Sequence, residues 1–81
     1  MEDFYVYSKD ECIFCRQIRQ VFLLKGISFQ EMKLDKDFDL ETFKEKFKSS
    51  KSKSFPQILH GEKYVGGFID TIKYLKEEKI I

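Results

Sequence analysis

The first 34 residues change from the periodicity of a strand to that of a helix and back again, and this order restricts the possible folds more than any other feature. Residues 3–8 read DFYVYS, a β-branched and aromatic run that predicts a buried strand. Apolar side chains then recur at three- and four-residue spacing, at Cys15, Ile18, Val21, Phe22 and Leu24. This spacing predicts a helix over residues 13–25, ended by Gly26. Residues 27–34 are again extended in character, so a right-handed crossover between two parallel strands is expected.

The rest of the chain adds a helix, a hairpin and a last helix. Leu40, Phe43 and Phe47 repeat at helical intervals and predict a second amphipathic helix. After a Ser/Lys loop over residues 48–54, short strands are expected at residues 55–60 and 63–67, joined at the turn His60-Gly61-Glu62-Lys63. Asp70 is predicted to cap a final helix that runs to Glu78.

The predicted order is therefore β-α-β-α-β-β-α. It indicates an α/β fold in which helices cover both faces of a four-stranded mixed sheet, the layout of thioredoxin-like proteins. At 81 residues, the chain is shorter than the roughly 100 to 200 residues of a typical domain, so one domain over residues 1–81 is expected. Nine Phe and four Tyr supply the large side chains that a short chain needs for a core.

Charge and hydropathy exclude several classes of partner. Fifteen Lys and Arg oppose fourteen Asp and Glu, so no global field attracts nucleic acid or membrane. The N-terminal stretch carries acids where a signal peptide carries bases, and no apolar run reaches the ~18 residues that span a bilayer. A cytoplasmic location and a monomer without membrane or nucleic-acid partners are expected.

Both cysteines, Cys12 and Cys15, lie at the predicted start of the first helix. A thiol attacks a disulfide only as its thiolate, and the backbone N–H groups at a helix start stabilise that negative charge. Lys9, three residues earlier, adds a cation. We therefore expect Cys12 to be the nucleophile of a redox pair and Cys15, one turn further along, to be the more buried resolving thiol.

Two other roles of the cysteine pair stay open at this stage. A purely structural disulfide would close a very small loop and would gain little stability. Zinc needs four ligands, and the chain offers only His60 besides the two cysteines, so a metal site would require carboxylates or a second chain. His60 itself is predicted to face solvent at the end of the hairpin. No metal site is therefore predicted.

Three segments together resemble the glutaredoxins, including their small phage-type members. They are KDECIFC, SFPQIL and YVGGFID, and they span nearly the whole chain in the family's order. The resemblance implies a glutathione-dependent dithiol oxidoreductase that reduces protein disulfides and glutathione mixed disulfides. It also implies a cis peptide bond before Pro56, which turns the backbone of Phe55 toward the cysteinyl part of glutathione.

The resemblance also implies a set of glutathione contacts. The start of the last helix would hold the γ-glutamyl carboxylate, with Asp70 facing the ammonium group, and Lys9 would meet the glycyl carboxylate. Lys44, Lys51 and Lys53 are further candidates for that second carboxylate. The complete predicted glutathione site is Lys9, Phe14, Phe55, Pro56, Gly67, Phe68, Ile69 and Asp70.

Several positions depart from the family pattern. Phe14 stands where tyrosine is usual, Phe55 replaces a smaller residue, and Ile69 stands where a polar residue is common. Ile13 replaces a proline, and family members without that proline more often hold a [2Fe-2S] cluster between two subunits, through a cysteine equivalent to Cys12 and glutathione. A cluster-binding homodimer and a thioredoxin-type protein reductase are therefore alternative functions. Glutathionylated proteins and ribonucleotide reductase are the substrates that the resemblance suggests.

Overall fold

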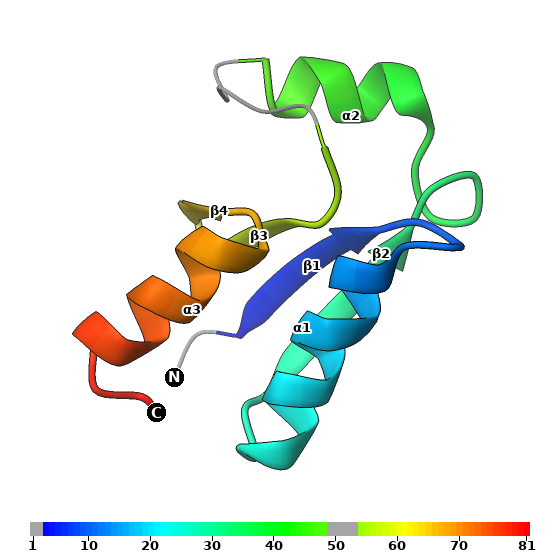
Figure 1. Cartoon of the computed structure of the whole chain (residues 1–81). Coiled ribbons are helices and arrows are strands. Elements are labelled where there is room, and N and C mark those ends of the chain that lie inside the picture. The colour runs from blue at the N-terminus through cyan, green and yellow to red at the C-terminus, as the bar shows by residue number, and fades with distance from the viewer. Residues whose placement is uncertain (1–2, 49–53) are drawn as a thin grey trace.

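The structure, a computed structural model, describes residues 3–48 and 54–81 (Figure 1). These residues form seven elements in the predicted order: β1 (Phe4–Ser8), α1 (Ile13–Leu24), β2 (Phe29–Lys33), α2 (Leu40–Lys46), β3 (Gln57–His60), β4 (Lys63–Gly66) and α3 (Phe68–Glu77). No helix within the described part of the chain is long and apolar enough to cross a lipid bilayer.

The four strands form one mixed sheet in the order β2-β1-β3-β4. β1 and β2 are parallel, as the strand-helix-strand pattern predicts, with Val6 opposite Glu31. β3 pairs with β1 and β4 in antiparallel fashion. β1 is thus a central strand, which explains why its sequence is apolar almost throughout.

Helices cover both faces of the sheet, as predicted: α1 and α3 lie on one face and α2 lies on the other (Figure 1). Side chains alternate along β1, so that Phe4 and Val6 point to the face covered by α1 and α3 while Tyr7 points to α2. The main core consists of six buried residues: Phe4, Val6, Ile18, Phe22, Ile58 and Leu75.

The opposite face is held by an aromatic cluster under α2. Phe43 on this helix and Phe47 at its C-cap are buried, and Phe47 packs edge-on against Tyr7 with ring centroids 5.1 Å apart. α2 begins where the backbone N–H of Thr42 donates a hydrogen bond of 2.8 Å to the carboxylate of Asp39. That bond lowers the pKa of Asp39.

Three sequence predictions need correction. Leu24 is 79% exposed, because about 100° of rotation per residue places it roughly 200° around α1 from the buried Phe22. β3 begins at Gln57 rather than at residue 55, since proline has no N–H to donate to a neighbouring strand. α3 begins at Phe68 with Gly67 as its N-cap, so Asp70 lies inside the first turn and is not the cap.

Candidate active site

Cys12 occupies the N-cap position of α1. Its backbone is extended (φ −118°, ψ 107°), and its sulfur accepts a hydrogen bond of 3.1 Å from the backbone N–H of Cys15. The helix begins immediately afterwards, because the backbone N–H of Arg16 donates to the carbonyl of Cys12. The sulfur therefore lies beside the positive end of a twelve-residue helix, as the sequence predicted.

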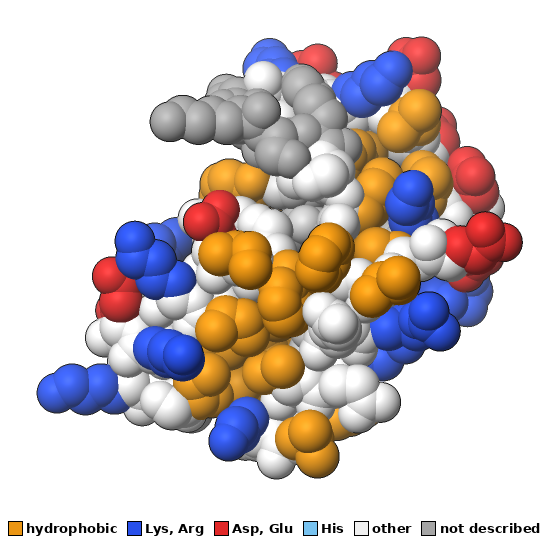
Figure 2. Space-filling view, in the orientation of Figure 1, with side chains coloured by type: hydrophobic (Ala, Val, Ile, Leu, Met, Phe, Trp, Pro, Cys, Tyr) orange, Lys and Arg blue, Asp and Glu red, His pale blue; other side chains and the backbone are white. Residues whose placement is uncertain are grey.

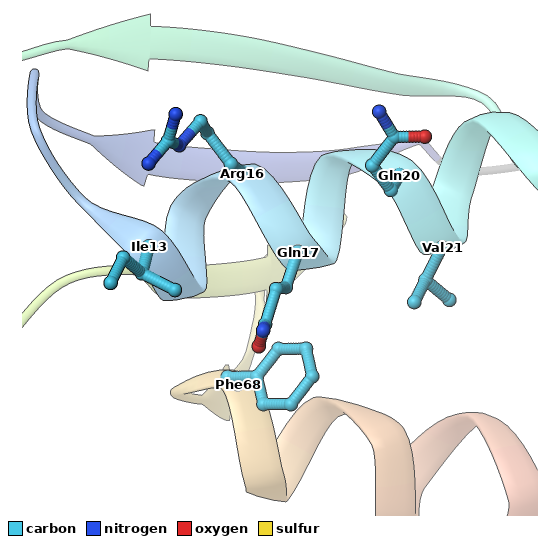
Figure 3. Close-up of a pocket in the computed structure, with 6 residues that line it drawn as sticks. All are labelled: Ile13, Arg16, Gln17, Gln20, Val21 and Phe68. Carbon is cyan, nitrogen blue, oxygen red and sulfur yellow. The ribbon is translucent and has the colours of Figure 1, made fainter.

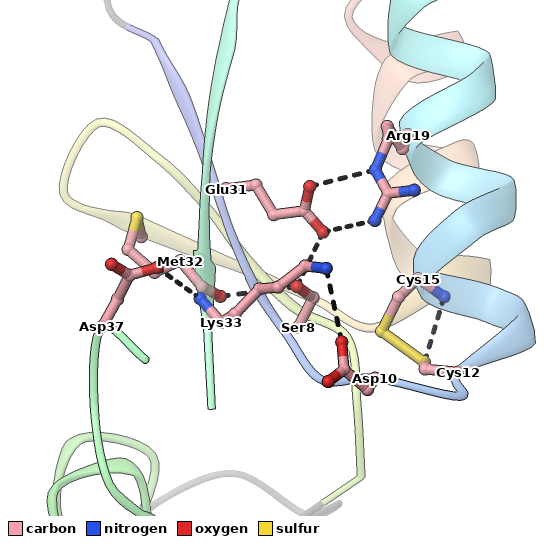
Figure 4. Close-up of polar contacts among 9 residues, drawn as sticks. All are labelled: Ser8, Asp10, Cys12, Cys15, Arg19, Glu31, Met32, Lys33 and Asp37. Carbon is pink, nitrogen blue, oxygen red and sulfur yellow. Dashed lines mark hydrogen bonds and ion pairs between the residues drawn. A yellow bond between two sulfur atoms is a disulfide. The ribbon is translucent and has the colours of Figure 1, made fainter. Parts of the chain in front are cut away.

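The two cysteines are joined by a disulfide, with their Cα atoms 5.2 Å apart (Figure 4). They differ in burial: Cys12 is 8% exposed and Cys15 is 1% exposed. Cys12 is thus the sulfur that another molecule reaches first, while Cys15 faces the interior of the fold. This asymmetry is the one expected of a nucleophile and its resolving partner.

A groove of about 250 Å³ lies where α1, the loop before β3 and the start of α3 meet. We call it the glutathione groove, after the ligand that the family resemblance predicts for it. It is lined by Phe14, Ser54, Phe55, Pro56, Gly67, Phe68, Ile69 and Asp70. Seven of these residues were predicted from the sequence, from three segments far apart in the chain. Ser54 was missed, although its place directly before Phe55-Pro56 was a signal for it.

The predicted lysines have different positions. The Nζ atom of Lys9 lies 5.7 Å from the centre of the Phe55 ring, so it stands beside the groove without lining it. Lys44 is exposed on α2 and does not line the groove. Lys51 and Lys53 lie outside the described residues.

Aromatic rings form two sides of the groove. Phe14 stacks on Phe68 with ring centroids 5.5 Å apart, which joins the start of α1 to the start of α3. The ring of Phe55 stacks on Phe43 at 4.4 Å and so belongs to the aromatic cluster under α2. A large residue at position 55 is therefore accommodated by the packing of α2. The peptide bond between Phe55 and Pro56 is cis, as predicted.

Two glycines open the other side of the groove. Gly66 has a φ of +129°, and a Cβ atom at this position would lie 2.6 Å from Oδ2 of Asp70. The absence of a side chain thus allows the Asp70 carboxylate to fold back over the junction between β4 and α3. Gly67 follows as an extended N-cap without a side-chain hydrogen bond. The helix start consequently offers backbone donors to an anion beside the Asp70 carboxylate.

Comparison with known protein families shows which family this chain belongs to. The family model for glutaredoxin matches residues 5–65, a stretch that contains both cysteines, the cis-proline and most of the sheet. This chain belongs to the glutaredoxin family. Thiol–disulfide oxidoreductase activity follows from that membership, with Cys12 and Cys15 as the redox-active pair.

Two curated relatives show how far the similarity extends. Glutaredoxin 3 of Escherichia coli K12 is 30% identical over 70 residues, which cover 86% of this chain and 82% of that protein. The hybrid peroxiredoxin hyPrx5 of Haemophilus influenzae is 32% identical over 73 residues, which cover 90% of this chain. The matched part is only 29% of that longer protein.

Solved structures share the fold. A wheat glutaredoxin has 31% identity and a TM-score of 0.81, over 95% of this chain and 75% of the wheat chain. A buckwheat glutaredoxin–glutathione complex has 21% identity and a TM-score of 0.82, over 98% of this chain and 73% of that one. These neighbours confirm the thioredoxin-like glutaredoxin fold that the order of elements predicted.

Near the disulfide, this glutaredoxin contains a polar cluster that sequence reasoning missed. Nε and an Nη atom of Arg19 donate hydrogen bonds of 2.9 and 2.6 Å to the two carboxylate oxygens of Glu31, and the buried Ser8 hydroxyl donates one of 2.7 Å (Figure 4). The cluster ties β1, β2 and α1 together. Arg19 and Ser8 lie 12 and 23 residues from Glu31 in the sequence, so no local sequence signal predicts the cluster.

The charges of this cluster stabilise each other. Burial raises the pKa of Glu31, but the hydrogen bonds from Arg19 and Ser8 and the positive charges of Arg19 and Lys33 outweigh it, so the pKa lies below its usual value. The hydrogen bond to Glu31 raises the pKa of Arg19, against an opposing effect of burial. Glu31 is therefore a charged structural group and not a proton acceptor at neutral pH.

His60 was predicted to face solvent, but its side chain packs against two other aromatic residues. Its ring stacks on Phe4 with centroids 4.1 Å apart, and Nδ1 lies 2.7 Å from the hydroxyl of Tyr74. The prediction failed because α3, which is distant in sequence, covers the end of the hairpin. Within residues 3–48 and 54–81, no three His, Cys, Asp or Glu side chains are grouped as a metal site would require.

Proposed function

We propose that this protein is a glutathione-dependent reductase of protein disulfides and glutathione mixed disulfides. The observation that supports this proposal is the position of the glutathione groove. It lies at the start of α1, where Cys12 is the more exposed sulfur, and combines apolar walls with an anion-binding helix start. The related buckwheat structure is a complex with glutathione.

In the monothiol route, the Cys12 thiolate attacks the glutathione sulfur of a protein–glutathione mixed disulfide. The bond between Cys12 and glutathione forms, the original S–S bond breaks, and the protein leaves as a thiolate that takes up a proton. A second glutathione thiolate then attacks the glutathione sulfur bound to Cys12. Glutathione disulfide leaves and the Cys12 thiolate is restored.

In the dithiol route, Cys12 attacks one sulfur of a substrate disulfide and forms a mixed disulfide. Cys15, as thiolate, then attacks the sulfur of Cys12. The substrate leaves with both sulfurs reduced, and the disulfide between Cys12 and Cys15 is left behind. Two glutathione molecules reduce that disulfide and leave as glutathione disulfide. The burial of Cys15 suits this second role, because it reacts only with a sulfur already bonded to Cys12.

The groove residues account for the three parts of glutathione. The cysteinyl part pairs with the backbone of Phe55 in the manner of an added strand. The γ-glutamyl carboxylate binds the backbone N–H groups at the start of α3, and its ammonium faces Asp70. The glycyl carboxylate extends toward the ammonium of Lys9, which is held over the Phe55 ring. Apolar contacts come from Phe14 and Ile69.

The test is turnover of a small glutathione mixed disulfide with glutathione and its reductase as the only electron source. The wild-type protein is expected to sustain turnover, Cys12→Ser to lose it, and Cys15→Ser to retain it while losing reduction of protein disulfides. Equal losses in the two variants would contradict the assigned roles. Turnover without glutathione, driven by a thioredoxin reductase, would support the thioredoxin-type alternative.

One feature favours a second candidate, a [2Fe-2S] homodimer ligated by Cys12 and glutathione. Ile13 replaces the family proline and is 62% exposed, so the start of α1 is not restrained by a proline ring. Cys15 opposes this role, because it can form a disulfide with Cys12 and so occupy the sulfur that a cluster would need. Reconstitution with iron, sulfide and glutathione distinguishes the two: a colourless monomer supports the reductase, and a coloured dimer supports the cluster carrier.

A further inference from the structure

A second groove, which the proposed function leaves without a role, lies along α1 on the side that faces α3. Its volume is about 600 Å³. It is lined by Ile13, Arg16, Gln17, Gln20, Val21 and Phe68. Figure 3 shows Ile13, Gln17 and Val21 on the side of α1 toward α3, where Phe68 points back at them, and shows Arg16 and Gln20 along the opposite rim. We call this feature the α1–α3 groove.

The α1–α3 groove is continuous with the reactive site. Ile13 follows Cys12 in the chain and Arg16 follows Cys15. Phe68 lines both this groove and the glutathione groove, so the two meet at its ring. A polypeptide bonded through its sulfur to Cys12 therefore has a path along α1 that does not cross the glutathione groove.

The surface of the groove favours a polypeptide with apolar and acidic residues. Ile13 is 62% exposed, and the neighbouring Ile69 is 72% exposed. Figure 2 shows hydrophobic side chains gathered in a band over α1 and α3, a feature that usually marks a binding surface. Arg16 is the one charged residue that lines the groove, and its guanidinium has no hydrogen bond or ion pair with any described residue.

We propose that the α1–α3 groove binds the chain of a disulfide-bearing protein substrate beside its reactive cysteine. An apolar residue of that substrate contacts Ile13 and Phe68, and a carboxylate pairs with Arg16. This inference rests on the dithiol route proposed above. In its first step the substrate S–S bond breaks as the bond to Cys12 forms, and the second substrate sulfur leaves as a thiolate and takes up a proton. The groove holds the substrate while Cys15 completes the reaction.

The kinetic test uses three synthetic peptides with one internal disulfide, Cys-Gly-Gly-Cys, flanked on both sides by Leu and Glu, by Leu and Lys, or by Ser and Glu. The wild-type protein is expected to reduce the Leu/Glu peptide with a kcat/KM about threefold higher than the Leu/Lys peptide, the size of one exposed ion pair. The Ser/Glu peptide should also be reduced more slowly. Arg16→Glu should reverse the preference between Glu and Lys.

Lys36→Glu is the matched control, because it changes the net charge equally in an exposed turn that borders neither groove. It should leave the peptide preference unchanged. Equal kcat/KM for the three peptides, with the glutathione mixed disulfide still turned over, would overturn the inference alone. Failure to reduce both the peptides and that small substrate would overturn the proposed function, and the inference with it.

A structural readout uses Cys15→Ser with Cys12 trapped as a mixed disulfide. One sample carries a single-cysteine Leu/Glu peptide and the control carries glutathione. Backbone amide NMR shifts that distinguish the two samples are expected at Gln17, Gln20 and Val21. Differences confined to Ser54, Phe55 and Asp70 would place the peptide in the glutathione groove and would overturn the inference.

Discussion

Two sulfur atoms with different surroundings carry the chemistry of this protein. Cys12 lies at the N-cap of α1, where its sulfur accepts a hydrogen bond from the backbone N–H of Cys15, whereas Cys15 is almost completely buried one turn further along. This difference in surroundings is the one that the proposed attacking and resolving thiols require. The groups proposed to bind glutathione are spread more widely, because they come from the start of α1, the cis-proline loop and the start of α3.

At the residue scale, Asp70→Ala and Lys9→Ala are expected to raise the KM for glutathione, each by about two- to fivefold, with little change in kcat. The reason is that each removes one exposed charge that pairs with a charged group of glutathione and takes no part in bond breaking. Steady-state kinetics with a glutathione mixed disulfide measure both constants. Glu77→Ala and Lys73→Ala, exposed on α3 outside the groove, are the controls. An unchanged KM in the first pair would contradict the placement of glutathione.

Most of the groove could be predicted from the sequence because its residues lie in three local motifs. The CxxC at a helix start, the single proline and the Gly-Gly pair together carry the resemblance to the glutaredoxins, and that resemblance implied the groove residues. The cluster of Arg19, Glu31 and Ser8 could not be predicted, since only the folded sheet brings these residues together. The packed position of His60 against Tyr74 was missed for the same reason.

At the element scale, the junction between β4 and α3 depends on a glycine. Gly66→Ala is expected to cost about 2 kcal/mol, because the φ of +129° excludes other residues and a Cβ would collide with Asp70. Gly26→Ala is the control: its φ of +66° is also left-handed, but no atom lies within 4 Å of the added Cβ, so about 1 kcal/mol is expected. Urea unfolding measures both costs. If both variants lost the same free energy of unfolding, the contact between the added Cβ and Asp70 would make no contribution to stability.

The attachment of α1 to the sheet through Glu31 should depend on pH. Because the pKa of folded Glu31 lies below the usual value of 4.5, its charge contributes stability above that pH, and the contribution is lost as the pH falls through the lower, folded pKa. Glu31→Gln is expected to lower the free energy of unfolding by about 1 kcal/mol at pH 7. The expected loss is small because the ion pair between Arg19 and Glu31 is partly exposed to solvent. Urea unfolding from pH 7 to pH 2 should show the difference shrink below pH 4.5. A constant difference over this range would contradict the ion pair.

At the scale of the whole molecule, one buried core holds both halves of the site in place. Phe22 packs against Phe4 and Phe29 and is completely buried. Phe22→Ala is expected to cost about 3 to 5 kcal/mol, a large part of the roughly 4 to 12 kcal/mol available to a domain of this size. Leu24→Ala, on the exposed side of the same helix, should change stability by no more than about 0.5 kcal/mol. Urea unfolding measures the stability of both variants. Similar losses of unfolding free energy for the Phe22 and Leu24 variants would contradict the buried position of Phe22 in the core.

The order of the elements and the mixed sheet could be predicted from hydrophobic periodicity, because strand and helix patterns differ along the chain. Periodicity did not determine where the elements end. The start of α3 follows from the backbone freedom of the Gly-Gly pair and the start of β3 from the missing N–H of Pro56. The exposed Leu24 shows that an apolar residue within a helix can still lie on its outer side.

Alkylation of the reduced protein tests most directly whether Cys12 is the reactive thiolate. The rate of reaction with iodoacetamide at pH 7 is measured for each cysteine by mass spectrometry, in the folded protein and in urea. An ordinary thiol is only a few per cent ionised at this pH. The account predicts that Cys12 reacts at least about tenfold faster in the folded protein than in urea, and that folded Cys15 is protected. A folded Cys12 that reacts no faster than in urea, or more slowly than Cys15, would contradict it.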